Sequence, residues 1–280
     1  MSQGSGSLRL TGVPLVLAGL GLLIASAACS SPARRFSQYA ASLGMRAEVV
    51  DGAEFQHVVF QRARELSRTL HVYLDGDGTP WRVAWPAADP TPRDPLLLRL
   101  MALDPAPSVY LGRPCYHGLA ATPPCGSALW TGERYSRSVV SSMAAALRNI
   151  VREGQFDRVA WFGYSGGGAL AVLLAPEFPE TSDLVTIAAN LDIDAWADLH
   201  GYSRLSGSLN PAMQPPLPPG IRQRHYVGGE DRVVPRHVTL RGSIDPTTVI
   251  VIPSYDHVCC WTAIWPAILA EVDAPGLPGR

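Results

Sequence analysis

Short runs of strand-forming residues alternate with helix-forming segments along most of this chain, and this alternation restricts the possible folds more than any other feature. Apolar residues in the segment 138–152 recur every three or four positions, which predicts a helix with one buried face. The expected strands are residues 69–74, 108–111, 158–162, 184–189, 225–227 and 248–252, and the expected helices are 95–102, 138–152, 167–175 and 261–272. Strands that alternate with helices form a mainly parallel sheet covered by helices on both faces. We therefore predict an α/β fold.

Two further features outline the domain. Residues 45–50 and 57–61 are β-rich and flank a turn-forming Asp-Gly pair, so we expect an antiparallel hairpin before the parallel strands. The segment of about 35 residues between the strands 184–189 and 225–227 contains many prolines and is longer than a connection needs. Because ligands bind at the carboxyl ends of parallel strands, we predict an inserted cap region at about 190–224 that covers the site.

The sequence Gly163-Tyr-Ser-Gly-Gly167 lies between an expected strand and an expected helix, and it matches the pattern G-x-S-x-G. A nucleophilic serine must project from a turn too tight for neighbouring side chains, and glycines permit such a turn. A Gly-rich turn in this position can also bind a phosphate, but the P-loop lysine and the G-x-G-x-x-G spacing are missing from this stretch. We therefore predict that Ser165 is a nucleophile.

A serine hydroxyl needs a base to take its proton, and histidine is the usual base. His257 ends a short loop after the last expected strand, so it is placed to reach the carboxyl edge of the sheet. His225 lies within an expected strand and His237 follows a proline, so both are expected to be structural or at the surface. His200 lies in the expected cap and could touch substrate. We predict that His257 is the base.

The base in turn needs an acid that orients it. Asp231 follows the expected strand 225–227 and is our candidate. Asp192 and Asp194 follow the preceding strand and are the reserve candidates. Asp256 is adjacent to the predicted base in sequence, but adjacent side chains seldom point at each other.

Ser165, Asp231 and His257 occur in the chain order of the α/β-hydrolase superfamily, which this sequence resembles over residues 45–280. The Gly-Gly-Glu-Asp-Arg-Val-Val-Pro sequence around the acid contributes to the resemblance. It implies the α/β-hydrolase fold and hydrolysis of an ester, with an amide or thioester as alternatives, through an acyl-enzyme on the serine. The competing interpretation is a catalytically silent protein that uses this scaffold to bind a ligand or a partner.

The resemblance also implies two backbone donors for the oxyanion of the tetrahedral intermediate. One is the N–H of Gly166, which follows the nucleophile. The other comes from the loop Asp75-Gly-Asp-Gly78, with the N–H of Asp77 favoured and that of Gly76 as the alternative. Lipases have a His-Gly loop here, and Asp75 departs from that pattern.

Aromatic residues near these segments could line an apolar pocket for the acyl group, although such residues are more often part of a core. The candidates are Tyr164, Trp81, Trp196, Trp130 and residues 215–219. The sequence has no HExxH pattern, no paired Cys/His set and no dinucleotide fingerprint, so we expect neither a metal nor another cofactor.

The N-terminus has the features of an export signal. A single Arg9 precedes the apolar stretch 13–25, which is too short for a comfortable membrane span. The sequence Ser26-Ala-Ala-Cys29 resembles the lipobox of bacterial lipoproteins, which implies cleavage before Cys29 and lipid on that residue. We therefore expect a signal peptide over 1–28, a tether over 29–40 and the hydrolase domain over 41–280, in a periplasm-facing lipoprotein of the bacterial envelope. Ser26 stands where the lipobox has Leu, so a soluble periplasmic or secreted protein is the alternative.

The remaining cysteines suggest disulfide chemistry if the chain is exported. Cys115 and Cys125 lie in a Gly/Pro-rich loop, and we predict a bridge between them that stabilises the fold by about 2–3 kcal/mol. Cys259 and Cys260 lack metal-ligand spacing and are expected to be two buried thiols or a vicinal pair. The loop with Cys115 and Cys125, together with Trp130-Thr131 and Arg134-Tyr-Ser136, is also similar to lipoprotein-type hydrolases of proteobacteria.

Charge excludes one class of partner. The chain has 23 basic and 24 acidic residues and a formal net charge of −1, with no long run of either sign. Nucleic acid is therefore not expected as a partner. The expected partners are a small acyl substrate and, through the lipid on Cys29, a membrane; the oligomeric state is left open.

Overall fold

The computed structural model describes residues 1, 31–62, 67–242 and 245–274. One compact unit begins at Ser31 and contains all the helices and strands discussed below. The expected signal peptide and Cys29 lie outside the described residues. Within the described part, none of the helices combines the length and the apolar character that crossing a membrane requires.

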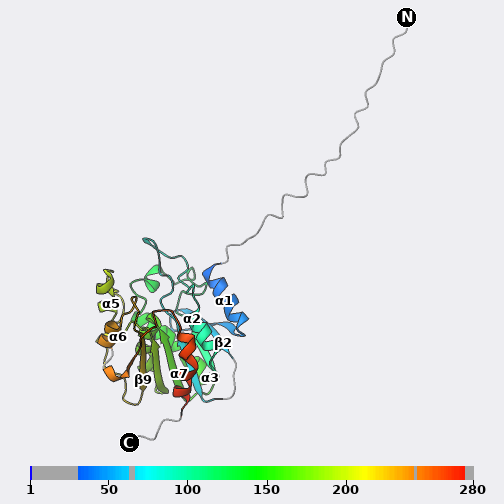
Figure 1. Ribbon diagram of the computed structural model, residues 1–280. Coiled ribbons are helices and arrows are strands. Elements are labelled where there is room, and N and C mark those ends of the chain that lie inside the picture. Colours follow the sequence, from blue (N-terminus) through cyan, green and yellow to red (C-terminus); the bar gives the residue numbers. More distant parts are fainter. Residues whose placement is uncertain (2–30, 63–66, 243–244, 275–280) are drawn as a thin grey trace. The chain divides into compact units, whose positions relative to one another are not determined.

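An eight-stranded sheet forms the centre of this unit, in the order β1-β2-β6-β3-β7-β8-β9-β10 (Figure 1). Its strands are β1 (Arg46–Asp51), β2 (Gln56–Arg62), β3 (Thr69–Leu74), β6 (Ser108–Leu111), β7 (Arg158–Tyr164), β8 (Thr181–Ile187), β9 (Arg222–Gly228) and β10 (Val249–Ile252). β1 and β2 form the predicted antiparallel hairpin, and β2 also runs antiparallel to β6. All other neighbours are parallel, which confirms the mainly parallel sheet.

Helices cover both faces of the sheet, and each face has its own hydrophobic core. α3 (Arg137–Glu153) and α4 (Gly166–Leu174) pack on one face. α1 (Pro32–Ser42), α2 (Leu96–Ala102) and α7 (Trp261–Asp273) pack on the other, and Figure 1 shows α7 in red in front of the sheet. Neighbouring residues of β7 point to opposite faces, so Trp161 enters the first core and Phe162 the second. This explains why the strand is apolar without alternation.

The tether predicted over 29–40 is wrong from Pro32 onward, because these residues form α1. The Ser31 hydroxyl caps the helix by accepting a hydrogen bond from the Arg34 N–H at 3.2 Å. Phe36 is 2% exposed and packs against the rings of Phe60 and Tyr110. The polar and basic residues that suggested a tether occupy the exposed face of this helix.

The segment 190–224 contains α5 (Ile193–His200) and the short helix η3 (Pro211–Met213), and part of it lines a cavity at the carboxyl edge of the sheet, as predicted for a cap region. A second feature over the same edge was not predicted from the sequence. It is a small hairpin of β4 (Trp81–Arg82) and β5 (Trp85–Pro86), which follows β3. The other elements are α6 (Arg236–Gly242), η1 (Ser127–Trp130), η2 (Ala175–Glu177) and η4 (Pro246–Thr248).

Two disulfides lie in the described part of the chain. Cys115 and Cys125 are bonded, with their Cα atoms 5.6 Å apart. Cys259 and Cys260 form a vicinal pair, so the two buried thiols are ruled out, and both residues are exposed.

Candidate active site

Ser165 occupies a sharp bend between β7 and α4, with φ +52° and ψ −121°. A positive φ is costly for a residue with a side chain, so the surroundings must hold it. The Ser165 N–H donates to the Ile187 carbonyl, and the Ser165 carbonyl accepts from the Asn190 N–H, both at 3.1 Å. A Cβ on Gly167 would overlap the carbonyl oxygens of Leu74 and Asp75. The glycine in the motif is therefore required by close backbone approach.

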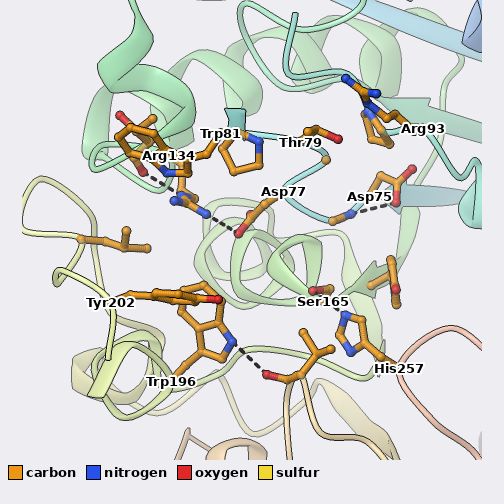
Figure 2. Close-up of a pocket in the computed structure, with 18 of the residues that line it drawn as sticks. Asp75, Asp77, Thr79, Trp81, Arg93, Arg134, Ser165, Trp196, Tyr202 and His257 are labelled. Carbon is orange, nitrogen blue, oxygen red and sulfur yellow. Dashed lines mark hydrogen bonds and ion pairs between the residues drawn. The ribbon is translucent and has the colours of Figure 1, made fainter. Parts of the chain in front are cut away.

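Ser165, His257 and Asp231 form one chain of hydrogen bonds. Nε2 of His257 lies 3.1 Å from the Ser165 hydroxyl oxygen, and Nδ1 lies 2.8 Å from Oδ2 of Asp231. The other oxygen of Asp231 accepts from the N–H groups of Val233 and Val234, each at 2.8 Å. Figure 2 shows the imidazole beside the serine. This arrangement allows the imidazole to take a proton from the hydroxyl while the carboxylate fixes its tautomer.

The other acidic residues considered from the sequence have different contacts. Asp256 accepts from the N–H groups of Val258 and Cys259, which directs its carboxylate into its own turn. Asp192 caps α5 by accepting from the Ala195 N–H at 3.1 Å. Asp194 accepts from the side-chain amide of Asn210, at 3.1 Å. The structure thus brings Asp231 to His257 and directs these three elsewhere.

Two of the other histidines lie away from this site. His225 is buried and bonded to the Thr186 hydroxyl at 2.9 Å, and burial lowers its pKa to about 4. His237 is exposed on α6. Both positions agree with a structural or surface role.

The loop after β3 packs against the nucleophile, since a Cβ on Gly76 would lie 3.4 Å from the Cβ of Ser165. The Gly76 N–H donates to the side chain of Asp75 at 2.8 Å. This bond occupies the amide that we considered as an alternative oxyanion donor, so the expectation for Gly76 is corrected. The amides of Gly166 and Asp77 remain the candidates.

The carboxylate of Asp77 lies in a buried cluster of positive charge. Arg113 and Arg134 contact it at 2.9 and 2.7 Å, and the Tyr135 hydroxyl donates to it at 2.6 Å. Burial opposes ionisation, but the two guanidinium groups outweigh it and lower the pKa of Asp77. Two guanidinium groups face the Asp77 carboxylate, and burial raises the pKa of the neighbouring Asp75 to about 7, so that Asp75 is only partly ionised at neutral pH. The surplus positive charge beside the bend favours a developing oxyanion.

Ser165 opens into a cavity of about 950 Å³. The predicted Trp81, Tyr164 and Trp196 line it, and Figure 2 shows Trp81 and Trp196 in this cavity with the Arg134–Asp77 ion pair. The sequence reasoning missed several lining residues that come from loops without a recognisable pattern, namely Thr79, Val83, Arg93, Arg134, Tyr202, Leu205, Val233 and Val258.

Three of the candidates for the pocket lining do not line the cavity. His200 does not line the cavity; its Nε2 lies 2.8 Å from the Val233 carbonyl and its ring stacks on Tyr202. Trp130 is buried in the core on the α3 side. Residues 215–219 are also not among those that line the cavity. The contacts of His200 and Trp130 depend on segments far apart in sequence, so local sequence could not reveal them.

Comparison with solved structures finds α/β hydrolases. A protein from Agrobacterium vitis described as a hydrolase matches with a TM-score of 0.56 and 14% identity, covering 82% of this chain and 99% of its own. A carboxylesterase from Bacillus subtilis matches with a TM-score of 0.53 and 11% identity, covering 87% and 99%. A membrane phospholipase A described as a bacterial virulence factor matches with a TM-score of 0.55 and 16% identity, covering 87% and 93%.

No family model and no curated protein sequence matches the chain. At these identities the structural likeness establishes the fold alone. Together with the sheet order and the helices on both faces, it shows that the chain has the α/β-hydrolase fold.

Proposed function

We propose that the protein is a serine hydrolase that cleaves a carboxylic ester through an acyl-enzyme on Ser165. The single observation that carries this proposal is the hydrogen-bonded chain from Asp231 through His257 to the Ser165 hydroxyl, which opens into a cavity. The fold alone would not support it, because one fold serves many functions.

In the proposed reaction, Nε2 of His257 accepts the hydroxyl proton while the Ser165 oxygen bonds to the ester carbonyl carbon. The N–H groups of Gly166 and Asp77 stabilise the resulting oxyanion. Its collapse breaks the bond to the alcohol, which leaves with the proton from His257. A water molecule then repeats the sequence on the acyl-enzyme and releases the acid. Asp231 keeps the imidazole oriented and stabilises its cation throughout.

An ester is the proposed substrate, with an amide or thioester as the alternatives. The carboxylesterase among the solved structures is in line with this choice. The apolar lining residues Trp81, Tyr164 and Trp196 would contact the acyl group. A panel of esters that differ in acyl length identifies the preferred substrate.

A fluorophosphonate probe, which reacts only with an activated serine, tests the proposal. The full-length wild type should be labelled, whereas Ser165→Ala should not. His257→Ala should slow labelling by several powers of ten while circular dichroism stays unchanged. His237→Ala, which alters an exposed histidine on α6, is the matched control and should label at the wild-type rate. A folded wild type that does not react would favour a catalytically silent binding protein.

We also propose that the protein is an envelope lipoprotein that faces the periplasm, with lipid on Cys29. The Ser26-Ala-Ala-Cys29 sequence supports this proposal. Growth with a radiolabelled fatty acid should label the wild type but not Cys29→Ser. An unlabelled wild type recovered outside the cytoplasm would instead indicate a soluble exported protein.

A further inference from the structure

The β4–β5 hairpin exposes an apolar tip beside the cavity. Arg82 pairs with Trp85, so Val83 and the alanine that follows it form the loop between the two strands. Val83 is fully exposed, Trp85 is 76% exposed and Trp81 is 46% exposed. Trp81 and Val83 also line the cavity, so the tip lies at its mouth.

The backbone at this tip does not favour an apolar residue. Val83 has φ +57°, and a positive φ at the first residue of a two-residue hairpin loop favours glycine. It is uncommon for a β-branched residue and costs energy. The valine therefore stands where a glycine would make a more stable turn, and where its side chain points into solvent.

Further exposed apolar residues lie on other loops around the same cavity. Tyr202 belongs to the cap region, Val233 follows β9, and Val258 follows the predicted base. We call these six residues the apolar rim: Trp81, Val83, Trp85, Tyr202, Val233 and Val258. Exposed apolar side chains gathered around one cavity mark an interaction surface more often than scattered single residues do.

The start of the folded unit lies next to this hairpin. The Ala33 N–H at the beginning of α1 donates to the carboxylate of Asp89 at 3.0 Å, and Asp89 lies three residues after Pro86, the end of β5. The chain that precedes α1 carries the apolar stretch 13–25 and Cys29. Cys29 and Pro32 are three positions apart in the chain, which spans at most about 10 Å. A membrane anchor in that segment would hold the start of α1, and with it the hairpin, close to the same lipid surface.

We propose that the β4–β5 hairpin enters a lipid surface and that the apolar rim seats the mouth of the cavity on it. Tryptophan is enriched at the boundary between headgroups and acyl chains, because one part of its ring is apolar and its N–H is polar. The exposed Arg82 at the hairpin would meet the headgroups, which favours a bilayer that contains anionic lipid. We therefore propose that a bilayer, and not a protein, covers the apolar rim. Binding of the chain to this bilayer does not depend on hydrolysis.

Fluorescence of the full chain with vesicles of phosphatidylethanolamine and phosphatidylglycerol tests the docking. Some acyl chains carry bromine, which quenches tryptophans that enter the hydrocarbon. The signal of Trp85 is the difference between wild type and Trp85→Phe, and with vesicles it should shift to the blue and be strongly quenched. Val83→Asp puts a charge at the tip and should remove most of this quenching.

A reporter at the opposite edge of the sheet is the matched control. Leu103 is 47% exposed and adjoins Asp104, whose carboxylate contacts His71 near the start of β3. The signal of a tryptophan at this position is the difference between Leu103→Trp in the Trp85→Phe background and Trp85→Phe alone, and it should show no quenching. The proposal is overturned if the chain does not bind the vesicles, if Trp85 is unquenched in the bound chain, or if position 103 is quenched equally. An unquenched Trp85 in the bound chain would instead indicate that the hairpin binds a protein partner.

The docking and the proposed hydrolysis can fail separately. Quenching requires no turnover, so Ser165→Ala should show the same quenching of Trp85 as the wild type. Loss of probe labelling with normal quenching would overturn the proposed function alone.

Discussion

At the scale of single residues, the bend at Ser165 depends on contacts between backbone atoms. Gly167 faces the carbonyl oxygens of Leu74 and Asp75, which belong to β3 and the loop after it. Backbone oxygens in a packed sheet cannot move aside as a flexible side chain would. The geometry of the nucleophile is therefore tied to the neighbouring strand as well as to its own turn.

Gly167→Ala should accordingly displace the bend. We expect loss of probe labelling and a lower free energy of unfolding, by roughly 1–3 kcal/mol as for other overpacked sites. Urea unfolding and labelling rates measure the two effects. Gly126→Ala is the control, because a Cβ there meets nothing within 4 Å, and it should leave both quantities near wild type. Wild-type labelling by Gly167→Ala would show that the bend tolerates a side chain.

The acid assignment makes a second prediction. Asp231→Asn removes the charge that stabilises the imidazolium and disturbs the tautomer of His257, so kcat for a soluble ester should fall by about 10⁴. Asp256→Asn is the control: its amide oxygen can still accept from Val258 and Cys259, and activity should stay near wild type. The reverse pattern would mean that the acid is misassigned.

The third prediction concerns Asp77, which is the counter-ion of two buried arginines. Asp77→Asn would leave Arg113 and Arg134 with a neutral partner, which should lower the free energy of unfolding by about 3–5 kcal/mol. Thermal unfolding measures this loss. Asp198→Asn breaks an exposed pair with Arg204 and should cost at most about 1 kcal/mol. A similar small effect for both variants would show that the buried cluster has another counter-charge.

At the scale of elements, sequence patterns predicted the main strands and helices far better than the short amphipathic helix α1 and the small β4–β5 hairpin. The strand β7 and the helix α3 have strong periodicity and were predicted within one or two residues. The helix α1 was missed, since its buried face consists of Ala33, Phe36 and Ala40 among many polar residues. Such a short apolar face becomes recognisable only against the surface that it covers.

The burial of α1 can be tested with one variant. Phe36 contacts Phe60, Tyr110 and His117, so Phe36→Ala should lower the free energy of unfolding by about 3–5 kcal/mol. Arg35→Ala on the exposed side of the helix should change it by less than about 0.5 kcal/mol. Urea unfolding of the full chain measures both. Equal, small effects would support the tether that the sequence suggested.

At the scale of the whole molecule, buried titratable groups set the pH dependence of stability. Burial lowers the pKa values of His57, His117 and His225 to about 4, 3 and 4, from 6.5. Between about pH 4 and 6.5 the unfolded chain binds more protons at these sites, so stability is lost as the pH falls. Asp75 acts in the opposite direction over this whole range, because burial raises its pKa from 3.8 to about 7. Because the three histidines outweigh the single aspartate, the free energy of unfolding should still rise as the pH increases toward 6.5.

Above pH 6.5 the sign reverses because of His71. Burial would lower its pKa, but the hydrogen bond to Asp104 and the charge of Asp273, 3.4 Å from Nε2, raise it to about 9. Its contribution is complete below pH 6.5 and is lost as the pH rises toward 9, at up to about 1.4 kcal/mol per pH unit. Urea midpoints at pH 4.5, 6.5 and 9 should therefore be highest at the middle value. His71→Gln should flatten the alkaline side, and an unchanged slope would assign that loss to another group.

The sequence by itself determined the order of the main strands and helices, the bend at 163–167, and the choice of Ser165, His257 and Asp231 as candidates. These features are encoded locally, since periodicity and glycine spacing depend on neighbouring residues alone. Tertiary structure decided which loops meet around the cavity, that Arg113 and Arg134 converge on Asp77, and that the hairpin exposes Trp85 beside the mouth. Those contacts join segments far apart in the chain, and they exist only after the sheet has packed and brought the ends of its strands to one edge.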